Sequence, residues 1–154
     1  MIRFNLFFVF IFFNFYQTLS QVYIDWSPSR VADELIYVQH TNSKSISEVK
    51  IYSYSDSLHA NVNGVKPLTM DCRFSSIDKK CNDQKIKFEC DECMQNWIND
   101  ILSIKKYKWK QLDKNRYISA PEFLIEFHFD TSKLSIQFLK STLSREEYKK
   151  LYKH

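Results

Sequence analysis

The sequence predicts an α+β fold that is mainly antiparallel β, arranged as a bent sandwich or a meander. Three observations support this prediction. Apolar and polar residues alternate in several short segments, which is the period of half-buried strands. The period changes to that of a helix around Trp97, and a hairpin followed by a helix is expected near the C-terminus. Four cysteines lie within 22 residues, from Cys72 to Cys93, and favour stabilisation by disulfides.

Residues 1–20 are predicted to be a signal peptide that is cleaved near Ser20. Arg3 precedes an apolar run from Phe4 to Phe13, and Thr18-Leu19-Ser20 supplies small residues for cleavage. A membrane anchor is the alternative, but the run is shorter than the roughly 20 residues that span a bilayer. We therefore expect a protein that is secreted or in the lumen of the secretory pathway, without a transmembrane segment after cleavage.

The remaining chain has the size of one domain. Removal of residues 1–20 leaves 134 of 154 residues, a single α+β domain at 21–154, and lowers the formal charge from +4 to +3 because Arg3 is lost. So small a charge, together with secretion, argues against a nucleic-acid partner. The abundance of Phe, Lys, Asn and Ile indicates an AT-rich coding genome, such as that of some parasites.

The first part of this domain is predicted to be a meander of about five to seven strands. The expected strands are Val22–Trp26, Leu35–His40, Val49–Tyr54, Leu68–Phe74 and Lys85–Cys90. Thr41–Ser47 is a polar turn between two of them, and Asn63-Gly64 is a tight-turn signal before Pro67.

A helix from about Glu92 to Ser103 is predicted to follow. One face of it is apolar, with residues at the spacing i, i+3, i+4, i+7 and i+8, namely Met94, Trp97, Ile98, Ile101 and Leu102. Asp91 is the expected N-cap. The acidic Asp91 and Glu92 at the helix start and the basic Lys105 and Lys106 after its end suit the helix dipole.

The last third predicts a hairpin and a terminal helix. Apolar residues alternate in Glu122–Asp130 and again in Leu134–Phe138, on either side of a polar turn at residues 130–133. Ser144 and Glu147 are spaced as a capping box, and Leu143 and Tyr148 as a hydrophobic staple.

Three pairings of Cys72, Cys81, Cys90 and Cys93 are possible. If the strands that carry Cys72 and Cys90 pair as a hairpin, the favoured pairing is Cys72–Cys90 and Cys81–Cys93. A zinc site is the alternative, although the chain has only one C-x-x-C pair.

Residues Leu35–Ile104 resemble the second half of a pleckstrin-homology domain. The similarity lies in the order of Lys50–Tyr54, Lys66–Phe74, Lys85–Phe88 and the helix with Trp97. It implies a bent β-sandwich at residues 21–106, closed by a helix with Trp97 in the core, and a C-terminal extension at residues 107–154. It also implies a binding scaffold without catalysis.

Residues Lys85–His154 are in turn similar to a thioredoxin-like domain. The order is a strand, Cys90-x-x-Cys93, a helix, Ala120-Pro121, a hairpin and a terminal helix. This resemblance implies a cis proline facing the dithiol and thiol–disulfide chemistry at Cys90 and Cys93, since a helix N-terminus lowers the pKa of a thiol. The carboxylates of Asp91 and Glu92 oppose a thiolate, so structural cysteines are the competing interpretation.

The candidate binding surface is Lys105-Lys106-Tyr107-Lys108-Trp109-Lys110. In an extended conformation Lys106, Lys108 and Lys110 project together, while Tyr107 and Trp109 point the other way. Such a basic and aromatic surface suits a sulfated glycan, an anionic lipid or an acidic protein. The alternative is a solvated edge strand that is protected by lysines.

The sequence offers little other chemistry. His40, His59, His128 and His154 lack metal-ligand spacing, so no metal or cofactor is expected. Glu126, His128 and Asp130 share one strand face. They are either a pH-sensitive or ligating patch or an ordinary solvated face of the sheet. The prediction is therefore a secreted, non-enzymatic binding or effector protein, with a thioredoxin-like thiol–disulfide protein as the alternative.

Overall fold

The computed structural model describes residues 21–41, 46–64 and 68–154. The signal peptide predicted at residues 1–20 lies outside these ranges. The elements, in chain order, are α1 (Pro28–Thr41), β1 (Ile46–Tyr54), β2 (Ser57–Gly64), β3 (Leu68–Phe74), β4 (Cys81–Phe88), α2 (Asp91–Ser103), η1 (Lys105–Tyr107), β5 (Lys110–Asp113), β6 (Arg116–Ile118), β7 (Ile125–Asp130), η2 (Thr131–Lys133), β8 (Ser135–Lys140) and α3 (Arg145–Lys153).

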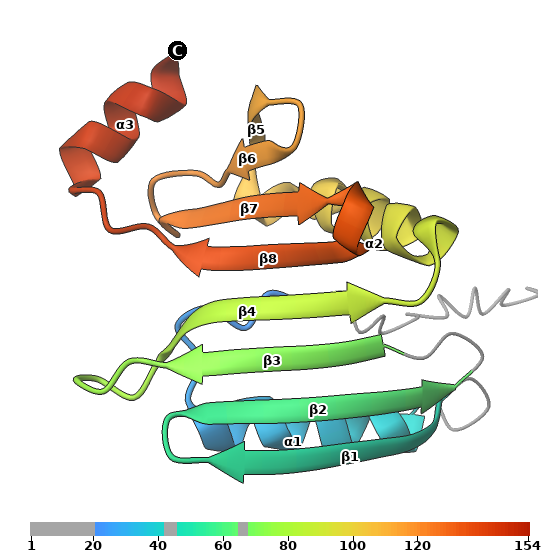
Figure 1. Ribbon diagram of the computed structural model, residues 1–154. Helices are drawn as coiled ribbons and strands as arrows, with labels where there is room; N and C mark the ends of the chain where they lie inside the picture. Colours follow the sequence, from blue (N-terminus) through green and yellow to red (C-terminus); the bar gives the residue numbers. More distant parts are fainter. Residues whose placement is uncertain (1–20, 42–45, 65–67) are drawn as a thin grey trace, which may run out of the picture.

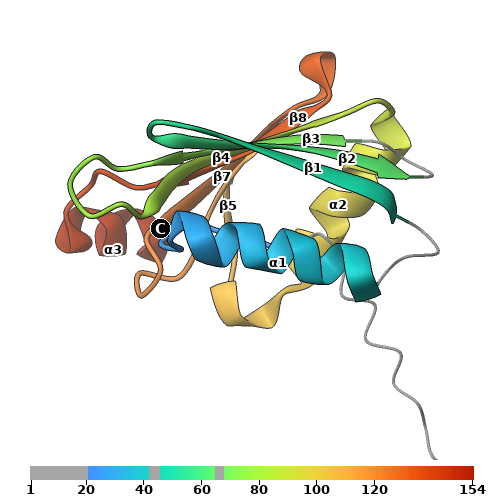
Figure 2. The same ribbon diagram turned by 90° about the horizontal axis from the view of Figure 1, so that it is seen from below.

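The eight strands form one antiparallel sheet in the order β1-β2-β3-β4-β8-β7-β6-β5 (Figure 1). Two four-stranded meanders, β1–β4 and β5–β8, meet where β4 pairs with β8. A helix precedes each meander, and both α1 and α2 cover the same face of the sheet (Figure 2). The predicted α+β class with mainly antiparallel strands is confirmed, in its meander form. The strands of residues 107–154 belong to the same sheet as those of residues 21–106.

The core lies between the sheet and these two helices. α1 contributes Val31, Leu35 and Val38, and the buried residues of α2 include Met94, Ile98 and Ile101. The sheet contributes the inward residues of its central strands, among them Met70, Ile86, Phe127, Ile136 and Phe138. Each large apolar side chain buried in this way contributes roughly 1.5–3 kcal/mol.

The strand predicted at Leu35–His40 is wrong, because these residues lie in helix α1. Val31, Leu35 and Val38 are spaced by four and three residues, so a helix buries all three on one face whereas a strand would not. The helix begins at Pro28, which suits a first helical position. The Ser27 hydroxyl accepts a hydrogen bond from the Arg30 backbone N–H at 3.3 Å.

The strand predicted at Val22–Trp26 is also absent. This segment instead lies beside the start of β4. The Asp25 N–H donates to the Cys81 carbonyl, and the Cys81 N–H donates to the Trp26 carbonyl, both at 2.9 Å. Asp25 has φ of 70°, so the backbone turns here and the pairing does not extend. The described part of residues 22–90 therefore has four strands rather than the five to seven expected.

The helix predicted around Trp97 is confirmed as α2, and the strand predicted at Leu68–Phe74 is confirmed as β3. The N-cap of α2 is Cys90 rather than Asp91, because the Cys90 sulfur accepts a hydrogen bond from the Cys93 N–H at 3.1 Å. The ring of Trp97 packs edge-on against Phe88, with centroids 5.6 Å apart.

The C-terminal hairpin and helix are confirmed as β7, β8 and α3. Both hydrogen bonds of the predicted capping box are present. The Ser144 hydroxyl accepts from the Glu147 N–H, and the Glu147 carboxylate accepts from the Ser144 N–H at 3.0 Å. Among the described residues, no helix combines the length and the apolar character that crossing a bilayer requires.

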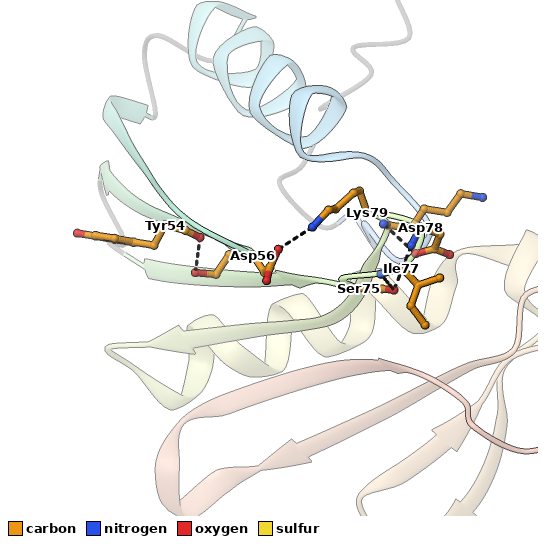
Figure 3. A network of polar contacts seen from close by, with 8 residues as sticks. Tyr54, Asp56, Ser75, Ile77, Asp78 and Lys79 are labelled. Atoms are coloured by element: carbon orange, nitrogen blue, oxygen red, sulfur yellow. Dashed lines mark hydrogen bonds and ion pairs between the residues drawn. The ribbon is translucent and has the colours of Figure 1, made fainter.

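Two turns at one end of the sheet are tied together by polar contacts (Figure 3). Asp56, between β1 and β2, pairs with Lys79, between β3 and β4, at 2.9 Å. The Ser75 hydroxyl accepts from the N–H groups of Ile77 and Asp78. Hydrogen bonds from the backbone of Lys80 and from Ser75 lower the pKa of Asp78. The result is an ordered turn that leaves the Ile77 side chain 94% exposed.

Candidate functional site

The predicted binding segment does not adopt the extended conformation that we expected. Lys105–Tyr107 form the 3₁₀ turn η1, and Lys108 has a left-handed backbone with φ of 48°. The edge strand β5 begins only at Lys110. Tyr107 and Trp109 both pack inward while Lys106 and Lys108 are exposed, as predicted, but the backbone that carries them is turned rather than extended. Burial raises the pKa of Tyr107 to about 12.

Trp109 lies in the aromatic part of the core. Its indole N–H donates to the Ile101 carbonyl at 2.9 Å. Its ring centroid lies 5.2 Å from that of Tyr107, 5.8 Å from that of Phe127 and 6.4 Å from that of Phe138. Trp109 thus holds the lysine-bearing segment against α2 and the sheet. Its ring is half-buried and does not form an exposed aromatic surface beside the lysines.

The terminal helix α3 packs against this same segment. The Tyr152 hydroxyl donates to the Lys108 carbonyl at 2.7 Å, and the Lys110 ammonium donates to the Tyr152 carbonyl at 2.7 Å. The buried Tyr148 hydroxyl donates to the Ile125 carbonyl at 2.6 Å, and burial raises the Tyr148 pKa to about 12. These contacts bring α3 to the segment that carries η1, which residue spacing alone did not indicate.

We define the lysine surface as the exposed lysines of these two segments: Lys105, Lys106, Lys108, Lys149, Lys150 and Lys153. Within the described ranges, none of the six is in an ion pair. Lys106 instead lies over the ring of Tyr107, 4.7 Å from its centroid. Lys110 is half-buried, and its ammonium holds α3.

Charge is distributed unevenly along the chain. Twelve basic and six acidic residues follow Ile104, whereas ten basic and twelve acidic residues precede Lys105. The last third therefore carries a formal charge of +6 and the rest −2. The lysine surface lies in the basic part.

The cysteine pairing that we favoured is wrong. Cys90 is bonded to Cys93, with their Cα atoms 5.3 Å apart, and Cys72 and Cys81 are buried thiols. The physical reason is the length of β4. Its eight residues span about 25 Å and place Cys81 and Cys90 at opposite ends of the strand. No side-chain movement can join Cys81 to Cys93 across that distance.

The disulfide lies at the N-terminus of α2, where the thioredoxin-like resemblance places a redox pair. Cys90 is half-buried and Cys93 is 9% exposed. The cis proline that this resemblance implies is absent, since every peptide bond of the described residues is trans, including that before Pro121.

A polar row crosses the sheet face that the helices leave uncovered. Strand register aligns His59, Asp71, Lys85, Gln137 and His128 across five neighbouring strands. His59 pairs with Asp71 through its Nδ1 atom. Lys85 lines a depression of about 570 Å³ beside this pair.

Glu126, His128 and Asp130 share this face, as the sequence predicted. The His128 Nε2 atom is 3.4 Å from the Glu126 carboxylate, which is 3.8 Å from the Arg116 guanidinium. The positive charge of Arg116 thus offsets the negative charge of Glu126. In the part of the chain that the structure describes, no three His, Cys, Asp or Glu side chains form a metal-ligand group.

Comparisons of the chain with protein-family models, with curated proteins and with solved structures give no match. Both resemblances drawn from the sequence therefore remain predictions.

Proposed function

We propose that the protein is a secreted, non-enzymatic binding protein that presents the lysine surface to an anionic partner. One observation supports this proposal above the others. Two lysine-rich segments, some 40 residues apart in sequence, are joined by the hydrogen bonds between Tyr152 and the backbone of Lys108 and between Lys110 and the backbone of Tyr152.

The electrostatics favour an anion at this surface. Six exposed ammonium groups without ion-pair partners among the described residues retain their full charge for a ligand. Their attraction extends about one Debye length, roughly 8 Å at physiological salt. The acidic balance of the preceding part of the chain orients the molecule, so that its basic part meets an anionic surface first.

The test is to reverse charges on each side of the Tyr152 contact. Lys105→Glu with Lys106→Glu changes η1, and Lys149→Glu with Lys150→Glu changes α3. The probes are immobilised heparin, as a sulfated glycan, and vesicles that contain phosphatidylserine. At about 1 kcal/mol per lysine near an anionic surface, the loss of two lysines alone should weaken binding about 30-fold, and repulsion by the two glutamates should weaken it further.

Lys110 is left unchanged in this experiment because its ammonium holds α3. Unchanged far-ultraviolet circular dichroism confirms that each variant is folded. If wild-type protein binds neither probe, or if either pair leaves affinity unchanged, the proposed surface is wrong.

A second candidate function is thiol–disulfide exchange at Cys90 and Cys93. The observation that favours it is the Cys90–Cys93 disulfide at the N-terminus of α2, the position where the helix dipole favours a thiolate. Reduction of insulin by the protein in the presence of dithiothreitol, and its loss in Cys90→Ser, would support this function. A reduction potential below about −300 mV would instead assign the disulfide a structural role.

A further inference from the structure

Two buried thiols lie on neighbouring strands of the sheet. Cys72 on β3 has no exposed surface, and Cys81 on β4 is 1% exposed. Strands β3 and β4 are paired directly, with Cys72 opposite Gln84 and Phe74 opposite Cys81. Both side chains belong to the hydrophobic core, on the face that α1 and α2 cover. The hairpin therefore places the two sulfur atoms on the same side of the sheet, near its closed end.

The two thiols are neighbours in this part of the core. The adjacent Cys81 side chain and burial raise the pKa of Cys72 well above its ordinary value. The Cys81 thiol also donates to the Asp83 carbonyl at 3.6 Å. Only the thiolate reacts in disulfide exchange, so the folded, reduced pair is slow to oxidise. A bond between these atoms forms most readily before the core closes.

We infer that Cys72 and Cys81 form a second disulfide bond when the protein folds under oxidising conditions. Each thiol loses a proton, the two sulfurs lose two electrons, and a disulfide such as oxidised glutathione takes up both and becomes two thiols. The bond closes a loop over the eight residues 73–80. That loop carries the ordered turn with Ile77, and Cys81 also holds the chain at Asp25 and Trp26. This inference does not depend on the proposed function.

Tryptic peptide mapping can test whether Cys72 and Cys81 are bonded, because cleavage by trypsin leaves the four cysteines on three peptides. Cys72 lies on Ile51–Arg73, since the bond between Lys66 and Pro67 resists cleavage, and Cys81 lies on Cys81–Lys85. Cys90 and Cys93 share the peptide Phe88–Lys105. The purified protein is reduced, refolded in a glutathione redox buffer, alkylated in denaturant, digested and analysed by mass spectrometry.

The expected result is a cross-link between Ile51–Arg73 and Cys81–Lys85, with neither cysteine alkylated, and a separate internal disulfide in Phe88–Lys105. Alkylation of both Cys72 and Cys81 in the refolded protein would overturn the inference. A cross-link from either of them to Phe88–Lys105 would overturn it as well.

Single variants provide a matched control. The Cys81 thiol should become alkylated in Cys72→Ala, and the Cys72 thiol should become alkylated in Cys81→Ala. Cys90 and Cys93 should stay bonded to each other in both variants. The wild-type peptide map tests the pairing without these variants, so the test does not depend on whether a variant folds. Retained protection of the remaining cysteine in either folded variant would contradict the pairing.

Discussion

The two halves of the sheet share one plan and differ in chemistry. In each half a helix precedes a four-stranded meander: α1 with β1–β4, and α2 with β5–β8. The strands of the first half have seven to nine residues, whereas those of the second have three to six. Pairing between long strands therefore contributes more to the stability of the first half, and side-chain packing contributes more to that of the second.

The cores of the two halves differ accordingly. Inward residues of β2–β4 are mostly aliphatic or sulfur-bearing, such as Ala60, Met70 and Cys72. In the second half the rings of Trp109, Phe127 and Phe138 form a continuous cluster, in which the last two are stacked with centroids 4.9 Å apart. The large rings compensate for the short strands, because each buries more apolar area than an aliphatic side chain.

The surfaces differ in charge. The half that begins with α2, residues 91–154, has twelve basic and nine acidic residues, whereas residues 21–90 have nine of each. The shared arrangement of elements therefore does not determine where a partner would bind, and the proposed lysine surface lies in the second half.

The largest expected effect is on the aromatic core. Phe127 has no exposed surface and stacks on Phe138, so Phe127→Ala should lower the free energy of unfolding by about 3–5 kcal/mol. Met70→Leu, at an equally buried position of the first half, conserves volume and should cost less than about 1.5 kcal/mol. Urea unfolding followed by tryptophan fluorescence measures both. A loss below about 1.5 kcal/mol in Phe127→Ala would contradict the tight aromatic packing described here.

An intermediate effect is expected at Gln84, a buried polar residue of the first half. Its side-chain oxygen accepts from the Tyr23 N–H at 2.7 Å, and its side-chain nitrogen donates to the Gln21 carbonyl at 3.0 Å. Gln84→Ala leaves both backbone groups without these partners and should cost about 1–3 kcal/mol. Gln137→Ala, on the open face, should cost less. Hydrogen exchange at Tyr23 should accelerate in the first variant only.

Much of this fold could be predicted from the sequence, because the pattern was regular in those segments. The alternation in Leu68–Phe74 and the helical spacing around Trp97 both predicted the observed elements. The run Leu35–His40 misled because its aromatic and β-branched content favours strands, while the spacing of Val31, Leu35 and Val38 favours a helix. The spacing determines the secondary structure of this segment, because it fixes which residues can be buried together.

The site was predictable in part. The lysines of residues 105–110 stood out by composition, but the contribution of α3 depends on tertiary contacts made by Tyr152. Trp109 was expected to face away from the lysines, and it does so by packing with Tyr107 in the core, but the extended backbone that was expected is replaced by the turn η1. The pairing of the cysteines depends on how far apart the ends of β4 lie, which four cysteine positions do not reveal.

The smallest expected effect concerns pH and the turn between β7 and β8. Hydrogen bonds from Ser132 and Lys133 lower the pKa of Asp130 to about 2. A carboxylate whose pKa is lowered on folding stabilises the protein above its unfolded pKa, near 4, and this stabilisation is lost as pH falls toward 2. Asp130→Asn should therefore differ from wild type in unfolding midpoint at pH 5 and much less at pH 2. A difference that is independent of pH would contradict this assignment.

The most direct test of the binding surface compares the two halves at equal charge. Lys106→Glu with Lys108→Glu alters the basic half, and Lys80→Glu with Lys87→Glu alters exposed lysines of the first half, so each pair lowers the formal charge by four. Affinity for heparin is measured against salt concentration for both variants and wild type. The lysine surface predicts a large loss of affinity and a weaker salt dependence in the first variant, and near wild-type behaviour in the second. Equal losses in the two variants would mean that net charge, and not the lysine surface, governs binding.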